Sequence, residues 1–379
     1  MLAAQIRKWY LSFGILCLAY LHAEDYPVDI SFLVADLKYS RERELKICEI
    51  QNGILSVFSG SSFLRPGDLS IQQEFFKMLS QYSPKGWTII NHIADPGLKW
   101  VFDQAYYWRK KNSLEEIFYD PEFFAESKKP VANKNDLSSY HGLLFVNATH
   151  LKQDEELSER CPGMVVVDQA TFPFWVDKDK MTALFGRNPT LAKYKPKWGL
   201  YKKNYHKDLA AQIIHDLKCD AFVIKPRGAF MGNGVTIVEK NQLDQVLEYI
   251  INPSESAKNN PDSAFRYWAQ DPFNSFIVEE FVMSDLIIAP HLGNKIYQPT
   301  MRVAFVLIHD KGEFKVHFLG GYWKTPAFAL SDDATFIQKH KDICKPPYYV
   351  GIDSVTWADV ERQMLIVLPM LHQEMLKGF

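Results

Sequence analysis

The segment that decides the fold runs from 220 to 238 and reads DAFVIKPRGAFMGNGVTIV. An apolar strand ends at Lys225, a turn with glycines at Gly228, Gly232 and Gly234 follows, and a second apolar strand begins. A cation followed by closely spaced glycines suits polyphosphate binding, because the ammonium group neutralises charge and bare backbone N–H groups approach without Cβ clashes. The alternative is a β-hairpin whose loop simply needs glycine.

The composition is that of a globular protein with two or three packed subdomains. The chain has 379 residues, of which 47% are hydrophobic and 23% are charged. A formal net charge of −2 gives no global attraction to nucleic acid or anionic lipid. The 5 cysteines are scattered without a CxxC pair, so they fit neither a zinc site nor a disulfide framework and favour a reducing compartment.

The N-terminal segment 1–23 has the three-part form of a secretory signal or membrane anchor. Arg7 and Lys8 precede an apolar run from Trp9 to Leu21. This run is short for a membrane-spanning helix, which needs about 20 apolar residues. A buried or amphipathic helix is the alternative, so the segment leaves export open, and membrane association too if it is an uncleaved anchor.

The first half of the chain is predicted to contain a hairpin and then a small open α/β unit. Tyr26–Asp36 and Leu45–Ile50 read as strands on either side of a charged turn. Between 63 and 175, apolar strands alternate with helix-like runs. The strands are Trp87–His92, Leu143–Asn147 and Met164–Val167, and the helices are Leu69–Tyr82 and Pro96–Lys111. Because this unit has no GxGxxG, a dinucleotide-binding fold of the usual kind is disfavoured.

The second half is predicted to mix helices and strands around the glycine-rich turn. Helices are predicted at Asp179–Phe185, Leu209–Lys218, Gln242–Ile251 and Val360–Leu376, and strands at Phe276–Val282, Thr300–His309 and Glu313–Trp323. The histidines form no HxxxH or HxH pair, and no serine lies in a GxSxG motif. Zinc-enzyme and hydrolase functions therefore lack support.

The order of these pieces resembles the ATP-grasp superfamily over about the second half of the chain. Lys180, in the opening helix, is similar in position to the first phosphate-binding lysine of that family. Lys225, followed by Gly228, Gly232 and Gly234, resembles the second lysine and the glycine-rich lid. The resemblance implies that both lysines bind ATP phosphates and that the lid closes over the nucleotide.

The segment Ile277–Val282 resembles the interdomain linker that reads adenine. In the family, backbone groups of this linker bond the adenine edge, which points to Glu279, Glu280 and Val282 here. A nearby acidic group holds the ribose in the family, and Asp285 is the candidate for that role.

Two basic residues further along resemble the catalytic cations of the family. Arg302 lies on a strand, Thr300–Val303, similar to the one that carries an arginine towards the γ-phosphate. Lys324 lies on the return strand, where the family has another basic residue. The resemblance implies that Arg302 stabilises the transferred phosphoryl group, and Lys324 is a weaker candidate for the same role.

The N-terminal hairpin of this chain resembles the metal-binding strands that normally lie at the C-terminal end of an ATP-grasp chain. Asp36, Glu49 and Asn52 would hold Mg²⁺, and the arrangement is similar to circularly permuted enzymes of the glutathionylspermidine synthetase type. One departure is that the family has Glu-x-Asn, whereas Asn52 is three residues after Glu49. Residues i and i+3 of a strand do not share a face, so Asn52 needs a bulge or turn, and Gln51 competes for the role. An ordinary edge hairpin is the alternative.

The resemblance implies a mixed α/β (α+β) fold in which two α+β subdomains grip ATP, beside a small open α/β domain. The expected division is 1–23 as a signal or anchor, 24–62 as the permuted hairpin, 63–175 as the substrate-side domain, 176–270 as the lid subdomain and 271–379 as the core subdomain.

The implied activity is an ATP- and Mg²⁺-dependent ligase that joins a carboxylate to an amine through an acyl phosphate and releases ADP. An ATP-grasp kinase, or a nucleotide-binding relative without turnover, is the alternative. The partners would be small-molecule or peptide carboxylates and amines, with no nucleic acid. Use of ATP and unpaired cysteines favour the cytoplasm.

Overall fold

The computed structural model describes residues 28–53, 57–66, 164–229, 232–252 and 262–378, with short pieces at 74–75, 78, 81, 87–90, 117–119, 142–145 and 259–260. The predicted N-terminal segment 1–23 and the predicted helix Pro96–Lys111 lie outside these residues. In the part described, the fold is mixed α/β, as the sequence predicts. None of the described helices is both long and apolar enough to cross a membrane.

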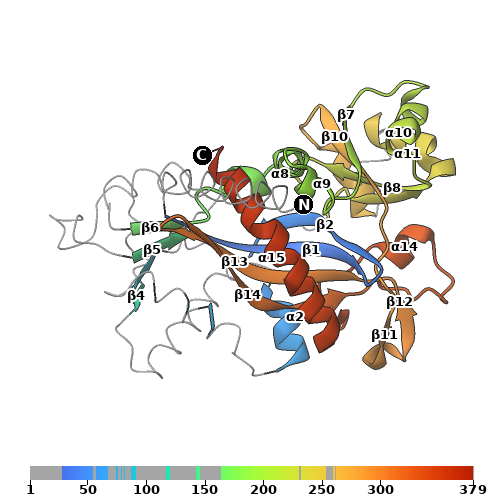
Figure 1. The fold of residues 1–379 in the computed structure, drawn as a ribbon. Helices are drawn as coiled ribbons and strands as arrows, with labels where there is room; N and C mark the ends of the chain where they lie inside the picture. The colour runs from blue at the N-terminus through green and yellow to red at the C-terminus, as the bar shows by residue number, and fades with distance from the viewer. Residues whose placement is uncertain are drawn as a thin grey trace, which may run out of the picture.

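The larger of the sheets joins strands from both ends of the chain (Figure 1). Its described strands run in the order β15-β14-β13-β1-β6-β5-β3-β4, and β2 also pairs with β1. The antiparallel strands are β1 (Asp29–Ser40), β2 (Arg43–Asn52), β13 (Thr300–Asp310), β14 (Glu313–Lys324) and β15 (Tyr349–Val350). The mutually parallel strands are β3 (Trp87–Ile90), β4 (Ile117–Tyr119), β5 (Gly142–Phe145) and β6 (Met164–Val167). The predicted hairpin and the predicted α/β unit thus share one sheet.

The second sheet is antiparallel, with strands in the order β7-β10-β8-β9. Its strands are β7 (Trp198–Lys202), β8 (Ala221–Pro226), β9 (Thr236–Glu239) and β10 (Ser275–Glu280). The helices α10 (Leu209–Leu217) and α11 (Leu243–Ile251) lie beside this sheet (Figure 1). Their residues Ile213 and Leu247 belong to one core with Phe222 and Phe276 of the sheet. Since β10 belongs to this sheet, the sheet continues past residue 270, where the sequence predicts the subdomain boundary.

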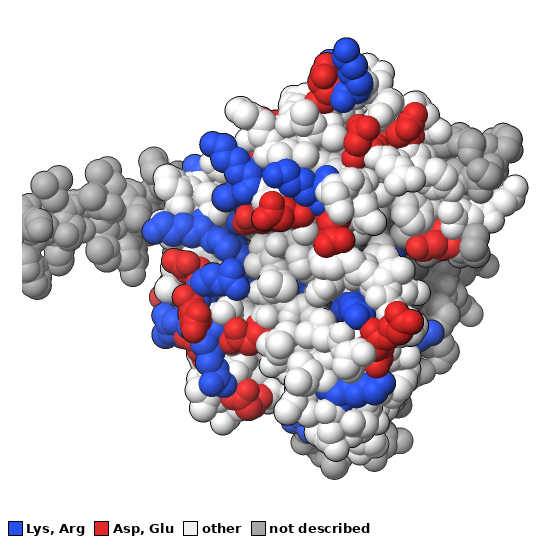
Figure 2. Space-filling view, turned by 90° about the vertical axis from the view of Figure 1, so that its right-hand side faces the viewer, with Lys and Arg blue, Asp and Glu red and all other residues white. Residues whose placement is uncertain are grey.

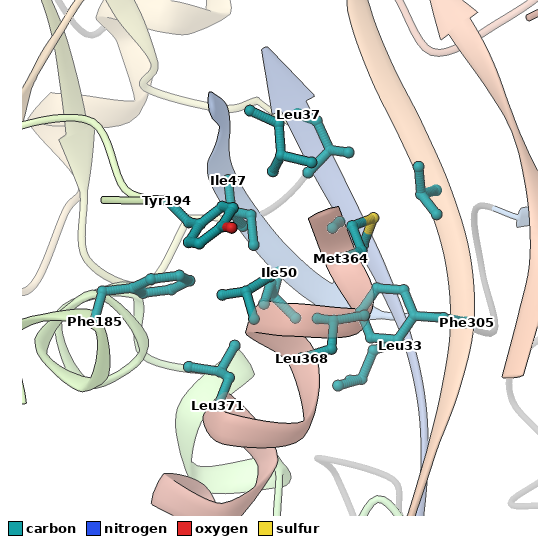
Figure 3. Close-up of a cluster of buried hydrophobic side chains, with 14 of the residues drawn as sticks. Leu33, Leu37, Ile47, Ile50, Phe185, Tyr194, Phe305, Met364, Leu368 and Leu371 are labelled. Carbon is teal, nitrogen blue, oxygen red and sulfur yellow. The ribbon is translucent and has the colours of Figure 1, made fainter. Parts of the chain in front are cut away.

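The core of the larger sheet lies under α15 (Ser354–Leu376), with α8 (Lys178–Gly186) beside it (Figure 3). Met364, Leu368 and Leu371 recur at helical spacing on α15 and pack on the sheet. Leu33 and Leu37 of β1 point to the same core because they alternate along the strand. One face of the sheet is therefore buried against α15, and the other face carries Asp36 and Arg302 as well as buried apolar side chains such as Phe32 and Val34.

The remaining described elements are short. They are α2 (Val57–Leu64), α7 (Phe172–Trp175), α9 (Pro189–Ala192), α13 (Ser263–Arg266) and α14 (Phe336–His340), with the two-stranded sheet β11 (Ile287–Ala289) and β12 (Lys295–Tyr297). On the face that Figure 2 presents, basic and acidic side chains are interspersed. That face therefore carries no broad patch of one charge sign.

The register of β1 brings distant polar residues together. Asp36 lies directly opposite Arg302 on β13 and directly opposite Glu49 on β2. Residues directly opposite each other share a face of a sheet, so all three project from the face that α15 does not cover. The prediction that the front hairpin shares a sheet with the Arg302 strand is confirmed. The register shifts after Asp36, where Cys48 has no partner on β1 and forms a β-bulge.

Candidate active site

A cavity of about 680 Å³ lies between the face of the larger sheet that carries Asp36 and the second sheet, and residues of both sheets line it. This volume is in the usual range of about 300–1,000 Å³ for small-molecule sites. The end of α14 and the segment that follows it supply one wall, with six consecutive residues from His340 to Lys345. The cavity combines apolar surface with cations on both sheets.

Two buried lysines share one carboxylate at the second sheet. Lys225 on β8 and Lys195, which precedes β7, lie 2.6 Å and 2.7 Å from the two carboxylate oxygens of Glu279 on β10. Both ammonium groups also donate to the backbone carbonyl of Cys48, at 3.0 Å and 2.9 Å. The bulge at Cys48 thus exposes a carbonyl that helps to orient both lysines.

Burial and the neighbouring charges shift the pKa values of all three groups. Burial opposes the charge of Lys225, but the adjacent Glu279 carboxylate outweighs it and raises the pKa of Lys225. Burial likewise opposes ionisation of Glu279, but Lys195 and Lys225 lower its pKa. For Lys195, burial prevails and lowers the pKa, with Glu279 acting in the opposite direction. The group carries two lysines against one carboxylate, so it favours an anionic ligand.

A second charged group lies on the larger sheet. Arg302 donates to both carboxylate oxygens of Asp36 at 2.8 Å, a bidentate geometry. Lys324 on β14 lies 2.9 Å from Asp36 and 2.6 Å from Asp342. Burial acts to raise the pKa of Asp36, but Arg302 and Lys324 outweigh it and hold that pKa well below its usual range. Arg302, Lys324 and Asp36 all line the cavity that Lys225 lines.

The predicted metal ligands lie together but have protein partners. Glu49 forms an ion pair of 3.0 Å with Lys178, and Asn52 donates its amide to the buried Asp168 carboxylate at 2.9 Å. Gln51 lies opposite Val34 and so shares the face of Asp36 and Glu49, whereas Asn52 lies opposite Leu33. The described residues hold no cluster of three or more His, Cys, Asp or Glu side chains arranged for a metal ion. The donor set matches Mg²⁺ in kind, because Mg²⁺ takes carboxylate and amide oxygens.

The predicted linker, Ile277–Val282, comprises the end of β10 and the two residues that follow it. Glu280 and Val282 line the cavity, and the Glu280 carboxylate accepts the N–H of Lys197 at 2.9 Å. Asp285, the predicted ribose ligand, is not among the lining residues. Its carboxylate accepts the N–H of Arg41 at 2.9 Å in the β1–β2 turn.

Lys180 does not line the cavity that Lys225 and Arg302 line. It is exposed on α8, whereas Lys178 on the same helix contacts Glu49 and donates to the carbonyl of Ala229. Neither Lys178 nor Lys195 was predicted from the sequence as a site residue. No periodicity marks Lys195, but it lies three residues before β7, the strand that pairs with the Glu279 strand, and that order is the available signal.

The strands β8 and β9 on either side of the glycine-rich turn form a hairpin, with Ile224 opposite Thr236. Gly228 would place an added Cβ 2.6 Å from the Phe273 ring, and Gly232 lines the cavity with φ of +69°. The turn thus combines a hairpin with a backbone that only glycine adopts readily.

Replacing Gly234 with alanine is expected to lower the free energy of unfolding by about 1–3 kcal/mol. Gly234 has φ of +71°, and an added Cβ would lie 2.4 Å from Cγ of Pro226. Chemical denaturation measures the loss. Gly186→Ala is the control, because Gly186 has no atom within 4 Å of an added Cβ. If the two variants were equally stable, alanine at position 234 would not be strained, and the prediction would be wrong.

Comparison with known proteins gives structural likeness only. No family model and no curated protein matches the chain. A protein from Methylobacillus flagellatus KT, provisionally named a gamma-glutamylcysteine synthetase, is 11% identical and has a TM-score of 0.47. The match covers 99% of this chain and 93% of that protein. D-alanyl-alanine synthetase A from Vibrio cholerae O1 biovar eltor str. N16961 is 9% identical and has a TM-score of 0.38, and the match covers 74% of this chain and 80% of that protein. D-cycloserine synthetase is 11% identical and has a TM-score of 0.37, and the match covers 76% of this chain and 82% of that protein. At TM-scores below 0.5 these likenesses carry no conclusion about function.

Proposed function

We propose that this protein is an ATP- and Mg²⁺-dependent ligase of ATP-grasp architecture that joins a carboxylate to an amine through an acyl phosphate. One observation carries the proposal: a single cavity is lined by Lys225 from one sheet and by Arg302 and Lys324 from the other. These cations come from distant parts of the chain, and each is at most 7% exposed. Buried cations around a cavity are the donor set that a polyphosphate requires.

ATP would lie with its phosphates between the two charged groups. Lys225 and Lys195 would exchange part of their pairing with Glu279 for phosphate oxygens, since Lys225 and Glu279 line the cavity and Lys195 contacts Glu279. The exit of β10, with Glu280 and Val282, would hold the adenine. The backbone of the glycine turn would cover the phosphates and exclude water from the reacting centre.

Arg302 and Lys324 would stabilise the group in transfer. In phosphoryl transfer the protein mainly positions groups and neutralises charge, so cations fixed before the reaction are worth most. The bidentate Asp36 contact fixes the Arg302 guanidinium in one orientation. The carboxylate substrate attacks the γ-phosphate, ADP leaves, and the amine then displaces phosphate from the acyl phosphate.

Asp36 and Glu49 would hold Mg²⁺, with Asn52 or Gln51 completing the set. The support is that Asp36 and Glu49 lie opposite each other on one face of the sheet. Magnesium bound there would neutralise phosphate charge. With the front hairpin in this role, the order of pieces is that of a circularly permuted ATP-grasp chain.

A nucleotide-binding relative without turnover is the second candidate. Each predicted metal ligand already has a protein partner, namely Arg302 and Lys324 for Asp36, Lys178 for Glu49, and Asp168 for Asn52. A metal ion would have to displace or share these contacts, which favours this alternative over a kinase.

The test is ATP turnover by the purified protein with Mg²⁺ and a panel of carboxylates and amines. The expected result is release of ADP and phosphate that depends on both a carboxylate and an amine. Release of AMP and pyrophosphate would contradict acyl-phosphate chemistry. Nucleotide binding without turnover over the whole panel would favour the second candidate.

A further inference from the structure

The strands β11 and β12 form a sheet of their own at the periphery of the molecule, paired with no other described strand (Figure 1). Ile288 of β11 and Ile296 of β12 lie directly opposite each other, so their side chains share one face of this sheet. They are 58% and 47% exposed, and Leu286, two residues before Ile288, is 55% exposed on the same side. Ala289 and Tyr297, on the other face, are buried. The sheet therefore presents an apolar face to solvent.

The backbone of Ile288 lies on an open edge of this sheet. Opposite residues of an antiparallel pair either exchange two hydrogen bonds or direct their N–H and C=O groups away from each other, and the two kinds of pair alternate. The carbonyl of Ile296 accepts the N–H of Leu330 at 3.0 Å, which directs it away from β11. The carbonyl of Ala289 accepts the N–H of Asn294 at 3.1 Å, which directs it towards β12. The N–H and C=O of Ile288 therefore point outward, where no described residue pairs with them.

This edge is complementary to itself. A residue whose N–H and C=O are both free can exchange two hydrogen bonds with the same residue of a second copy across a two-fold axis. Such an axis brings identical charges close together, and like charges across an interface oppose association. The segment 286–294 contains no Asp, Glu, Lys or Arg, so this repulsion is absent around Ile288. Sheet edges that remain unpaired usually carry charged side chains, lysine above all, and this edge has none.

We propose that the protein forms a homodimer in which β11 pairs antiparallel with β11 of a second copy, centred on Ile288. The two sheets then join into one of four strands, and the Ile288 side chains of the two copies contact each other on its apolar face. A stable interface covers about 800 Å² per partner, which three half-exposed side chains do not reach, so the dimer is weak and concentration-dependent. Neither β11 nor β12 lines the large cavity, so the dimer is independent of the proposed ligase activity.

The first experiment measures the mass of the full chain in solution by analytical ultracentrifugation. The mass of wild type is expected to rise from that of a monomer towards that of a dimer between about 1 and 100 μM, the behaviour of a small interface. Ile288→Lys places two like charges at the axis and is expected to weaken the dimer about tenfold or more. Val355→Lys is the matched control, because Val355 is a 69% exposed apolar residue on α15, and it should dimerise as wild type does.

The second experiment tests the register by cross-linking and does not depend on how Ile288→Lys folds. Residues that exchange hydrogen bonds across an antiparallel pair have Cα atoms about 5.5 Å apart, within the range of about 4.4–6.8 Å that a disulfide spans. Mild oxidation of Ile288→Cys is therefore expected to link two copies through position 288, as mass spectrometry of the linked peptide would show. Val355→Cys should give no more linked dimer than the native cysteines of wild type. A wild type that stays monomeric at 100 μM, a dimer that persists in Ile288→Lys, or equal linkage in the two cysteine variants would each overturn the proposal.

Discussion

Replacing Asp36 with alanine is expected to lower the free energy of unfolding by about 3–5 kcal/mol, because it breaks a buried ion-pair network from one side. Arg302 is 5% exposed and Lys324 is 3% exposed, so water compensates only in part for the lost carboxylate. Lys324 retains Asp342 at 2.6 Å, whereas the guanidinium loses both of its carboxylate contacts. The loss should appear as a lower midpoint in chemical denaturation.

The contribution of Asp36 also has a defined pH dependence. Its folded-state pKa is depressed, so the stabilisation is fully present above the unfolded-state pKa of about 3.9. It is lost as the pH falls from there through the folded-state pKa. The difference between wild type and Asp36→Asn should therefore shrink below about pH 4. Glu313→Ala is the control, because Glu313 pairs with Lys315 at 2.7 Å but lies exposed, and its loss should leave the midpoint unchanged. A pH-independent difference would exclude the ion-pair explanation.

Much of the fold was predictable because the strands and helices of the second half are marked by local pattern. Thr300–His309 was predicted and Thr300–Asp310 is observed, and the helix Leu209–Lys218 is observed as Leu209–Leu217. Apolar alternation and helical spacing involve residues that are close in the sequence, so strands and helices can be predicted from them without knowledge of the tertiary fold. The sheet that joins Asp36 to Arg302 was also predicted, but from the order of the pieces rather than from their pattern.

The charged groups were harder to predict because side-chain partners are chosen by tertiary packing. Lys178 and Lys180 are two residues apart on one helix, yet Lys178 contacts Glu49 and Lys180 is exposed. Both residues are lysines, so residue type does not distinguish them. Which of the two faces the sheet is decided by how α8 is rotated about its axis, and its buried residues Met181, Leu184 and Phe185 fix that rotation. Lys195 lies outside any regular element, and only the pairing of β7 with β10 brings it to Glu279.

Replacing Lys225 with alanine is expected to weaken Mg-ATP binding by about 10- to 100-fold, the range for one or two charge-assisted hydrogen bonds. Lys225 is buried at the cavity wall, its pKa is raised, and it carries a full charge that phosphate would meet without intervening water. Lys195→Ala should give a loss of similar size, because Lys195 shares the Glu279 carboxylate. Calorimetric titration with Mg-ATP measures both.

Two further lysines make the prediction specific. Lys180→Ala should leave affinity unchanged, because Lys180 is exposed and does not line the cavity, although its position in the sequence resembles that of a phosphate ligand. Lys203→Ala is the matched control, since Lys203 forms an ion pair of 3.4 Å with Asp271 beside the same sheet but does not line the cavity. If Lys180→Ala weakened binding and Lys195→Ala did not, the phosphates would lie near α8 rather than at Glu279. In that case the pair of lysines on Glu279 would serve stability, because each lysine neutralises part of a buried carboxylate that could not remain ionised alone.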